Sequence, residues 1–397
     1  MDVPAENLST ELKAIIEAAV KEALKPLTEV TQHKTPVAGD PNPDISIRTV
    51  APETKPEKGI RFARAVRALA AQKNDLRAAA YHIEHVFHDP VLAKALAEGA
   101  GTAGGFLVPP EVAREIIEML RGQAVVMKSG ARTMPMNSNI LTLPKMTAGA
   151  QAEYVGENSN IVKSEESFGQ LNLSAKKLAV LVPISNDLIR DSSPSADGIV
   201  RDDLVNAMSL RADKAFIRDD GTANKPKGIL YWVPAGNKFN ANATVNAANV
   251  IADLGKARRL VLASGALMAR PCWYMSPRTE GYLMVLTDAN SNFVFRAEMI
   301  LGKLLGYPFY LSTQIPENLG AGTNESEVYF GDAVDGIVGE NEDLLVDVST
   351  EAAYHDGTNV VAAFSLDQTV IRVIERHDFG LRHDTSYAVI QAVKWGA

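Results

Sequence analysis

A long polar segment between two strand-like stretches constrains the fold of this chain most strongly. Residues 147–160 carry mainly glycine, alanine, glutamate and asparagine, with few apolar side chains that a core could bury. Apolar residues resume at alternate positions at Phe168, Leu171 and Leu173, which is typical of a β-strand. Loops longer than about 12–15 residues are uncommon in compact domains unless they have a function. We therefore expect residues 145–178 to form a long two-stranded arm that projects from the body.

The segments that flank this arm predict a packed body with two prominent helices. Pro110 stands in the first turn of a predicted helix through Leu120, where proline is favoured because that amide has no helical partner. Residues 178–184 are almost continuously apolar and predict a buried strand. A second long helix is expected over about 196–218. Gly221 follows it and is expected to cap that helix in a left-handed conformation.

The N-terminal hundred residues predict a helical appendage with a flexible tether. Residues 7–30 have the apolar periodicity of an amphipathic helix, which could pair with another copy or dock on a different partner. Residues 34–59 hold five prolines and little apolar content, which predicts an extended linker. Residues 60–98 return to helical periodicity, and glycines within 99–105 release the chain. We interpret residues 1–98 as a unit that is separable from the core.

The C-terminal half predicts an α/β unit followed by more strands. Residues 246–320 alternate helical and strand-like segments, with Cys272 in a predicted strand beside Trp273. Because Cys272 is the only cysteine, no intrachain disulfide can form, and we expect it to be a small buried apolar group. Further strands are expected at residues 328–332, 344–348, 370–375 and 387–393.

Three short motifs, taken in their order along the chain, resemble those of a known family. They are Gly104-Gly105-Phe106-Leu107-Val108-Pro109, the run Asp220-Gly221-Thr222 followed by Pro226-Lys227-Gly228-Ile229, and Gly306-Tyr307-Pro308-Phe309. Through them, residues 101–397 resemble the major capsid proteins of tailed bacteriophages, which share the Hong Kong 97-type fold.

The resemblance implies an α+β fold with a peripheral domain, an axial domain, a long spine helix and an extended two-stranded loop, preceded by a helical N-terminal appendage. The implied divisions are a scaffolding-like (delta) appendage 1–98 with its Pro-rich linker 34–59, an N-terminal arm and first helix 99–144, the extended loop 145–178, a peripheral domain with the spine helix 179–235, an axial domain 236–325, and strands returning to both domains 326–397.

The same resemblance implies a major capsid protein that self-assembles through pentamers and hexamers into an icosahedral shell around phage double-stranded DNA. Its main partners would be copies of itself, with a maturation protease, a portal and decoration proteins as further candidates. It would assemble in the bacterial host cytoplasm and reside in the virion capsid. The shell of a cellular nanocompartment, similar to an encapsulin, is the alternative within this fold, and a hydrolase is the alternative outside it.

The net charge of −8 limits the kinds of partner that the chain can hold. Proteins that grip DNA phosphates concentrate Lys and Arg, so we expect the shell to enclose DNA without binding a specific sequence. No run of about 18 apolar residues predicts a membrane helix. The acidic N-terminus lacks the apolar core of a secretory signal. We therefore expect no membrane partner and synthesis in a reducing cytoplasm.

Two groups of histidines are candidate sites for chemistry. One is the set His82, His85 and His88, which recurs every three residues on a predicted helix; a metal site is conceivable, but a solvated helix face explains the spacing more simply. The other would allow a Ser–His–Asp hydrolase, but no Gly-x-Ser-x-Gly elbow accompanies it. Its members are His377, Asp378, His383 and Asp384, with Ser365 or Ser386 as the nucleophile. We predict no catalytic, cofactor-binding or metal-binding residue, no cofactor and no enzymatic activity.

Charged residues near the two ends of the arm and in the appendage offer two further hypotheses. The row Arg61, Arg64, Arg67 and Arg77 could contact nucleic acid or an acidic partner, but a solvated or ion-pairing face is the simpler interpretation. Some members of the resembled family join subunits through a Lys–Asn isopeptide bond. Lys145 and Lys163 are the lysines of the loop region, and Asn359 is the nearest asparagine, at a poorly matching position. We therefore expect no cross-link.

The turn around Gly221 could be mistaken for a calcium or phosphate loop. An EF-hand requires ligands at alternate positions and a closing glutamate, which this segment lacks. A phosphate-binding Walker motif requires Gly-Lys-Ser/Thr, which is also missing there. A structural turn at the end of a helix is the interpretation that we keep.

Overall fold

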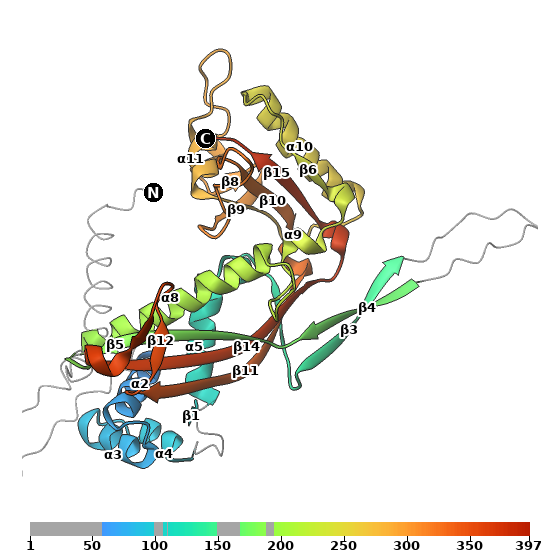
Figure 1. The fold of residues 1–397 in the computed structure, drawn as a ribbon. Coiled ribbons are helices and arrows are strands. Elements are labelled where there is room, and N and C mark those ends of the chain that lie inside the picture. Colours follow the sequence, from blue (N-terminus) through green and yellow to red (C-terminus); the bar gives the residue numbers. More distant parts are fainter. Residues whose placement is uncertain (1–57, 99–105, 109, 149–166, 188–193) are drawn as a thin grey trace, which may run out of the picture. The chain divides into compact units, whose positions relative to one another are not determined.

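The computed structural model describes residues 58–98, 106–108, 110–148, 167–187 and 194–397 (Figure 1). Residues 56–397 form one compact unit. The helix expected over residues 7–30 and nearly all of the linker 34–59 lie outside the described residues. Helices and two main β-sheets alternate along the described chain, so the expected α+β class is confirmed.

A five-stranded sheet is built on two strands of 14 residues each, which pair antiparallel. These are β11 (Gly336–Ser349) and β14 (Gln368–Leu381), and they contain the strands predicted at 344–348 and 370–375. The order of the sheet is β1-β11-β14-β5, with β2 paired in parallel to β11. The remaining bounds are Phe106–Leu107 for β1, Arg132–Pro135 for β2 and Lys176–Ser185 for β5.

Five helices share one apolar core with this sheet. The predicted helices over 110–120 and 196–218 are confirmed as α5 (Pro110–Gln123) and α8 (Pro194–Arg218). The other three are α2 (Ile60–Ala71), α3 (Leu76–Val86) and α4 (Pro90–Glu98). The core places Val200, Leu204 and Met208 of α8 in the same cluster as Val346 and Val373 of the sheet.

The packing of α2–α4 corrects one expectation. Phe62, Leu69 and Ile83 are at most 1% exposed and lie in the same apolar cluster as Val346 and Val373. Residues 60–98 are helical as predicted, but they are not separable from the core. Helical periodicity shows that a stripe is buried without showing what buries it, and here the body of the protein does so.

Strand β5 corrects a second expectation, because it lies at the edge of its sheet and is not a buried strand. Leu178, Val180 and Val182 turn one face toward the apolar core, while Leu181 on the other face is 43% exposed. Pro183 fits this position, since an edge strand can leave one amide unpaired. The apolar run of residues 178–184 therefore forms a strand with one face packed on the core and the other face exposed.

A six-stranded sheet forms the second main layer, in the order β6-β15-β10-β7-β9-β8. Its two faces belong to different cores: Trp273 and Phe330 face one cluster, while Tyr274, Tyr329 and Tyr387 face the other. The alternation confirms the strands predicted at 272–275, 328–332 and 387–393. Their bounds are Lys238–Asn240 (β6), Pro271–Met275 (β7), Lys303–Leu304 (β8), Tyr307–Leu311 (β9), Ser326–Asp332 (β10) and Tyr387–Val393 (β15).

Three helices complete the first of these cores, and smaller elements connect the layers. The helices are α10 (Ala247–Ala263), α11 (Pro277–Val285) and α12 (Arg296–Met299). Ser276 caps α11, where its side chain accepts a hydrogen bond from the amide of Thr279. The connecting elements are α6 (Val125–Lys128), α9 (Ile229–Trp232), η2 (Ala235–Asn237), η3 (Ala333–Asp335), η4 (Ala363–Leu366), η5 (Asp384–Ser386) and the strand pair β12 (Ala353–His355) with β13 (Val360–Ala362).

The arm is a separate two-stranded sheet of β3 (Ile140–Ala148) and β4 (Ser167–Ser174), as Figure 1 shows. The strands pair antiparallel from Ile140 opposite Ser174 to Ala148 opposite Ser167. The described part of the arm thus begins at residue 140 and ends at 174, earlier than the predicted range 145–178. Residues 176–178 belong to β5, which pairs with β14. The span 149–166 lies outside the described residues.

Candidate assembly site at the root of the arm

The root of the arm is the part that packs on the body of the protein. There, a leucine seat formed by Leu171 and Leu173 packs against two glycines of the five-stranded sheet. Leu171 and Leu173 of β4 are at most 3% exposed and pack with Met136 and Ile337. A Cβ atom at Gly380 would lie 2.7 Å from Leu171 Cδ1 and 2.9 Å from Leu173 Cδ2. A Cβ atom at Gly339 would lie 2.6 Å from Met136 Sδ. Missing side chains on β11 and β14 therefore create the space that the two leucines fill.

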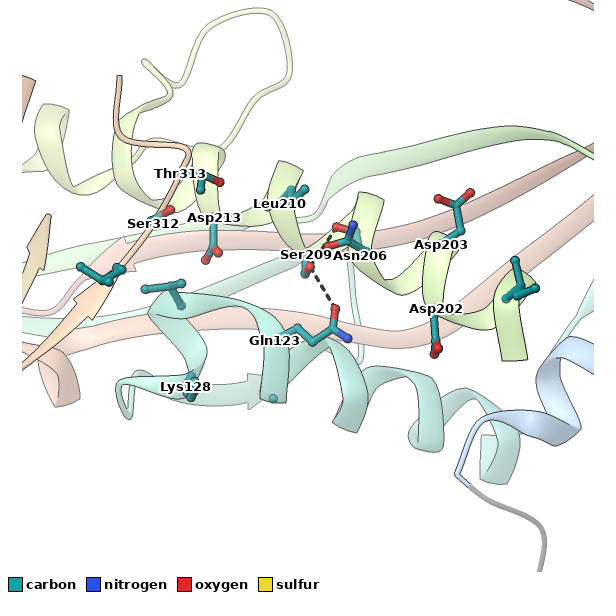
Figure 2. A pocket seen from close by; sticks show the side chains of 14 residues that line it. Gln123, Lys128, Asp202, Asp203, Asn206, Ser209, Leu210, Asp213, Ser312 and Thr313 are labelled. Carbon is teal, nitrogen blue, oxygen red and sulfur yellow. Dashed lines mark hydrogen bonds between the residues drawn. The ribbon is translucent and has the colours of Figure 1, made fainter. Parts of the chain in front are cut away.

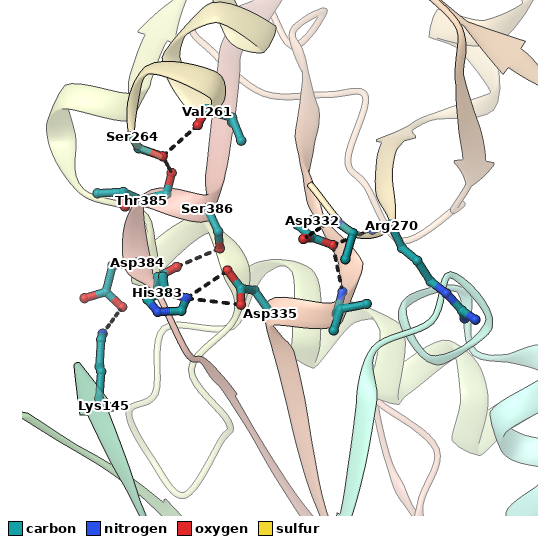
Figure 3. A network of polar contacts seen from close by, with 12 residues as sticks. Lys145, Val261, Ser264, Arg270, Asp332, Asp335, His383, Asp384, Thr385 and Ser386 are labelled. Atoms are coloured by element: carbon teal, nitrogen blue, oxygen red, sulfur yellow. Dashed lines mark hydrogen bonds and ion pairs between the residues drawn. The ribbon is translucent and has the colours of Figure 1, made fainter. Parts of the chain in front are cut away.

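Two polar contacts fix the same root. The buried carboxylate of Asp378 accepts hydrogen bonds from the amides of Ser174 at 2.7 Å and Phe379 at 2.9 Å. Burial raises the pKa of Asp378, and these amides oppose the shift. On the other strand of the arm, Lys145 Nζ lies 2.6 Å from Asp384 Oδ1, with side chains 12% and 40% exposed (Figure 3).

The chain passes between the two main sheets twice, from β10 to β11 and from β14 to β15, and both connections are hydrogen-bonded to the six-stranded layer (Figure 3). Asp384 lies in the second connection. In the first, Asp332 accepts hydrogen bonds from the amides of Ala269 and Arg270, at 2.7 and 2.9 Å. In the second, Ser264 at the end of α10 donates to the carbonyl of Thr385 at 2.9 Å. Lys145 thus connects the arm to a segment that is tied to α10.

The residues proposed for a hydrolase do not form a triad in the described chain. Ser386 Oγ donates to the backbone carbonyl of His383 at 2.7 Å, not to its ring, and Ser365 Oγ donates to the carbonyl of Ala362. The ring of His383 contacts Asp335 at 3.1 Å.

The remaining two members of that cluster are buried in the sheet. Asp378 serves the arm root, as described above. His377 is 2% exposed, and burial, with a smaller contribution from Arg211, lowers its pKa to about 4. An imidazole held neutral in this way, with no serine beside it among the described contacts, lacks the partner that nucleophilic catalysis requires.

The histidines of α3 have local partners. His85 Nδ1 contacts the carbonyl of Tyr81 at 2.9 Å and stacks on that ring, while His82 meets Phe87 edge to face. His88 adopts a left-handed backbone conformation after the helix, with φ of +52°. Across the described residues, no group of three or more His, Cys, Asp or Glu side chains is arranged to hold a metal ion.

The arginine row and the cross-linking residues also have local roles. Arg61 Nε lies 3.2 Å from Asp89, and Arg67 is buried with its guanidinium near the Phe87 ring, so this row is not simply a solvated face. Lys145 is engaged by Asp384 within its own chain. Asn359 is exposed in the β12–β13 turn, and Lys163 lies outside the described residues.

The sequence analysis did not predict a cluster of ionisable side chains where α5 meets the five-stranded sheet. Arg121 of α5 pairs with Glu340 at 2.5 Å, and Glu340 lies opposite His377 in the strand register. Glu375 lies two residues before His377, and the two side chains approach to 3.9 Å. Burial, reinforced by Glu340 and opposed by Arg121, raises the pKa of Glu375 to about 8. The alternation of β14 places 375 and 377 on one face, but the strand's surroundings were not predictable.

A groove with a cavity of about 890 Å³ runs along the face of α8 that does not pack on the sheet (Figure 2). Its walls mix the exposed apolar residues Ile199 and Leu210 with carboxylates. Among these, burial raises the pKa of Asp213 to about 6, against the effect of hydrogen bonds from backbone amides of α6. Gln123 and Ser209 meet across the groove at 3.4 Å.

Comparison with known proteins identifies the family. Residues 104–392 match the Phage capsid family over most of the chain. The chain belongs to this family. Membership makes it a structural protein of a virion capsid. The major capsid protein of Klebsiella oxytoca phage phiKO2 is 38% identical over 338 residues, which is 84% of this chain and 78% of the relative. The capsid polyprotein of Pseudomonas phage PAJU2 is 27% identical over 372 residues, 86% of this chain and 55% of that polyprotein.

Solved structures agree at the level of the fold. A chain from Microbacterium phage Oxtober96 superposes with a TM-score of 0.53 at 18% identity, covering 68% of this chain and 90% of the other. The capsid of a native GTA particle gives a TM-score of 0.52 at 18% identity, with the same coverage. The Hong Kong 97-type capsid fold expected from the sequence is thus confirmed. No helix in the described ranges combines the length and the apolar character needed to cross a membrane.

Proposed function

We propose that this chain is the repeating subunit of an icosahedral phage shell, assembled through pentamers and hexamers around double-stranded DNA. The observation that carries the proposal is the arm, whose strands β3 and β4 pair only with each other among the described elements. Only the root of this ribbon packs on its own body, and a two-stranded ribbon is marginally stable alone in water, so the part beyond the root gains stability from another surface. A neighbouring copy in a closed shell supplies such a surface.

The two main layers take different positions in this proposal. The five-stranded sheet with α8 corresponds to the peripheral domain and spine helix, and the six-stranded sheet with α10 corresponds to the axial domain around five-fold and six-fold axes. Large apolar side chains are exposed in both layers, such as Leu301 at 75% and Phe364 at 82%. Such side chains favour contact with another protein surface.

The other roles follow from the family and from the contacts of the candidate residues. We assign the N-terminal residues before the compact unit a scaffolding role during assembly in the host cytoplasm. A maturation protease, a portal and decoration proteins are the partners that such a subunit would meet. We assign no catalytic, cofactor-binding or metal-binding role to any residue, because the candidate histidines and serines are engaged in backbone and packing contacts.

The arm supplies the direct test of this function. Residues 149–160 are replaced by a short Gly-Ser turn, which leaves the seat of Leu171 and Leu173 intact. We expect a folded subunit that still forms small rings but no longer closes into shells, seen by negative-stain microscopy and light scattering. Gly236→Ala, at an open position of the body, is the control. Shells as abundant and as heat-stable as those of the parent would refute the role of the arm.

A further inference from the structure

The arm is held at two places on its two different strands. On β4, Leu171 and Leu173 fill the space above Gly339 and Gly380. On β3, Lys145 reaches Asp384 in η5, within the connection from β14 to β15. The leucine seat and the hydrogen bond from the Ser174 amide to Asp378 both hold β4 at the base of the arm, so neither holds β3 or sets the tilt of the arm about that base. An ion pair on the opposite strand supplies the missing second point.

We propose that the Lys145–Asp384 ion pair is a positioning contact that sets the angle at which the arm leaves the body. The inference rests on the proposed function, because a fixed angle matters when every arm must reach the same place on a neighbouring copy. In this proposal Lys145 acts by orienting the arm and does not itself contact a neighbouring subunit.

Leverage explains why one contact at the root has a large effect. Leu141 of β3 pairs with Leu173 of the leucine seat, and Ala148 ends the strand seven residues later, about 23 Å away at about 3.3 Å per residue. A tilt of about 10° displaces that end by about 4 Å, which is more than a hydrogen bond between subunits can tolerate. An uncontrolled root angle would therefore change which residues of two copies meet.

The surroundings of the pair suit positioning better than stabilisation. The Lys145 side chain is mostly buried, and its ammonium lies 5.8 Å from the ring of Trp232, which also carries Lys227 at 4.1 Å. Asp384 is 40% exposed, and Lys145→Met removes the ammonium while it keeps an apolar side chain of similar length, so no buried charge is left unpaired. Removal of the pair should therefore leave the subunit folded while it frees the arm.

The first test compares assembly with subunit stability in the full chain. Lys145→Met and Asp384→Asn remove the pair, Lys145→Arg keeps its charge, and the exchange Lys145→Asp with Asp384→Lys restores it in reverse. Lys58→Met, which breaks the exposed pair with Glu118, is the matched control. We expect the two pair-breaking variants to lose at least about tenfold in yield of uniform closed shells, with the Tm of Lys145→Met within about 3 °C of the parent. The arginine, exchange and control variants should assemble like the parent.

The second test measures the arm in the unassembled subunit and does not depend on shells. Spin labels are placed at Ala148→Cys, the last residue of β3, and Ala263→Cys, the last residue of α10. The native Cys272 does not compete for label, because burial raises its thiol pKa to about 12. Electron–electron distance measurements should give one narrow distribution with Lys145 present, and a broadened or shifted one in Lys145→Met.

The two tests separate the inference from the function on which it rests. A parent chain that never forms closed shells contradicts the proposed function, while the spin-label distances still decide the role of Lys145. A Lys145→Met chain with the parent's distance distribution overturns the inference. A Lys145→Met chain that forms shells like those of the parent, at the same yield, also overturns the inference. So does a Lys145→Met chain whose Tm falls by clearly more than about 3 °C, because its loss of shells would then follow from instability.

Discussion

Gly228 shows at the scale of one residue what a glycine of a short sequence motif does in the fold. A Cβ atom there would lie 2.6 Å from the amide nitrogen of Arg218 and 2.7 Å from the carbonyl oxygen of Ala215, both in the last turn of α8. The amide of Gly228 donates to the carbonyl of Asp219 at 2.8 Å. Gly221 adopts the left-handed conformation expected of it, but it lies in the turn beyond α8 and not at the cap.

We predict that Gly228→Ala destabilises the subunit by about 3 kcal/mol, because backbone atoms of a helix cannot move aside as a side chain can. Urea denaturation of the unassembled chain measures the change. Gly236→Ala is the control, since nothing lies within 4 Å of its added Cβ atom. Equal stability of the two variants would contradict the close approach.

Glu375 gives a second prediction at this scale, through the pH dependence of stability. Burial, with Glu340 nearby, raises its pKa from an ordinary 4.5 to about 8. The folded chain therefore keeps a proton that the unfolded chain releases, and its free energy of unfolding falls as pH rises from about 4.5 to 8. In Glu375→Gln this loss is removed.

The stability of Glu375→Gln relative to the parent should thus rise across that window, by on the order of 5 kcal/mol, and level off above pH 8. Denaturation curves at pH 5, 6.5, 8 and 9 make the comparison. Groups far from residue 375 titrate alike in both chains and cancel in the difference. A difference that stays constant from pH 5 to 9 would show that Glu375 is not a buried neutral acid.

At the scale of elements, α2–α4 decide where the N-terminal part can be cut. Phe62, Leu69 and Ile83 are buried in the body, so these helices belong to the fold. We predict that deletion of residues 2–55 leaves a folded subunit with impaired or irregular assembly, whereas deletion of 2–98 prevents folding. Circular dichroism and thermal melts check the fold, and microscopy checks assembly. Normal uniform shells from the 2–55 deletion would exclude a scaffolding role.

The elements also show what periodicity can and cannot predict. The helix of 196–218 was predictable because its apolar residues recur with helical spacing, and the strands at 272–275 and 387–393 because they are short apolar runs that contain aromatic or β-branched residues. The edge position of β5 was not, since an apolar run does not say which of its faces has a neighbour. The seat of the arm was equally hidden. Gly339 and Gly380 carry no pattern of their own, and only the pairing of β11 with β14 brings them under Leu171 and Leu173.

At the scale of the whole molecule, charge bears on the contents of the shell. Residues 101–397 contain 27 Lys and Arg against 34 Asp and Glu. We predict that the unassembled full chain binds duplex DNA weakly and without sequence preference, with a Kd no tighter than about 10⁻⁴–10⁻⁶ M at about 150 mM salt. A gel-shift titration with two unrelated duplexes checks this. Sub-micromolar binding to one duplex alone would contradict a shell that only encloses DNA.

Closure of many copies into one shell is the central claim, and electron microscopy of the expressed full chain tests it most directly. The account predicts closed particles of uniform diameter, in which image classification resolves both five-fold and six-fold rings of subunits. Particles should persist on dilution, since interwoven arms slow the loss of subunits. A chain that remains a monomer or small oligomer at every concentration, with well-folded subunits and no closed particles, would contradict the account.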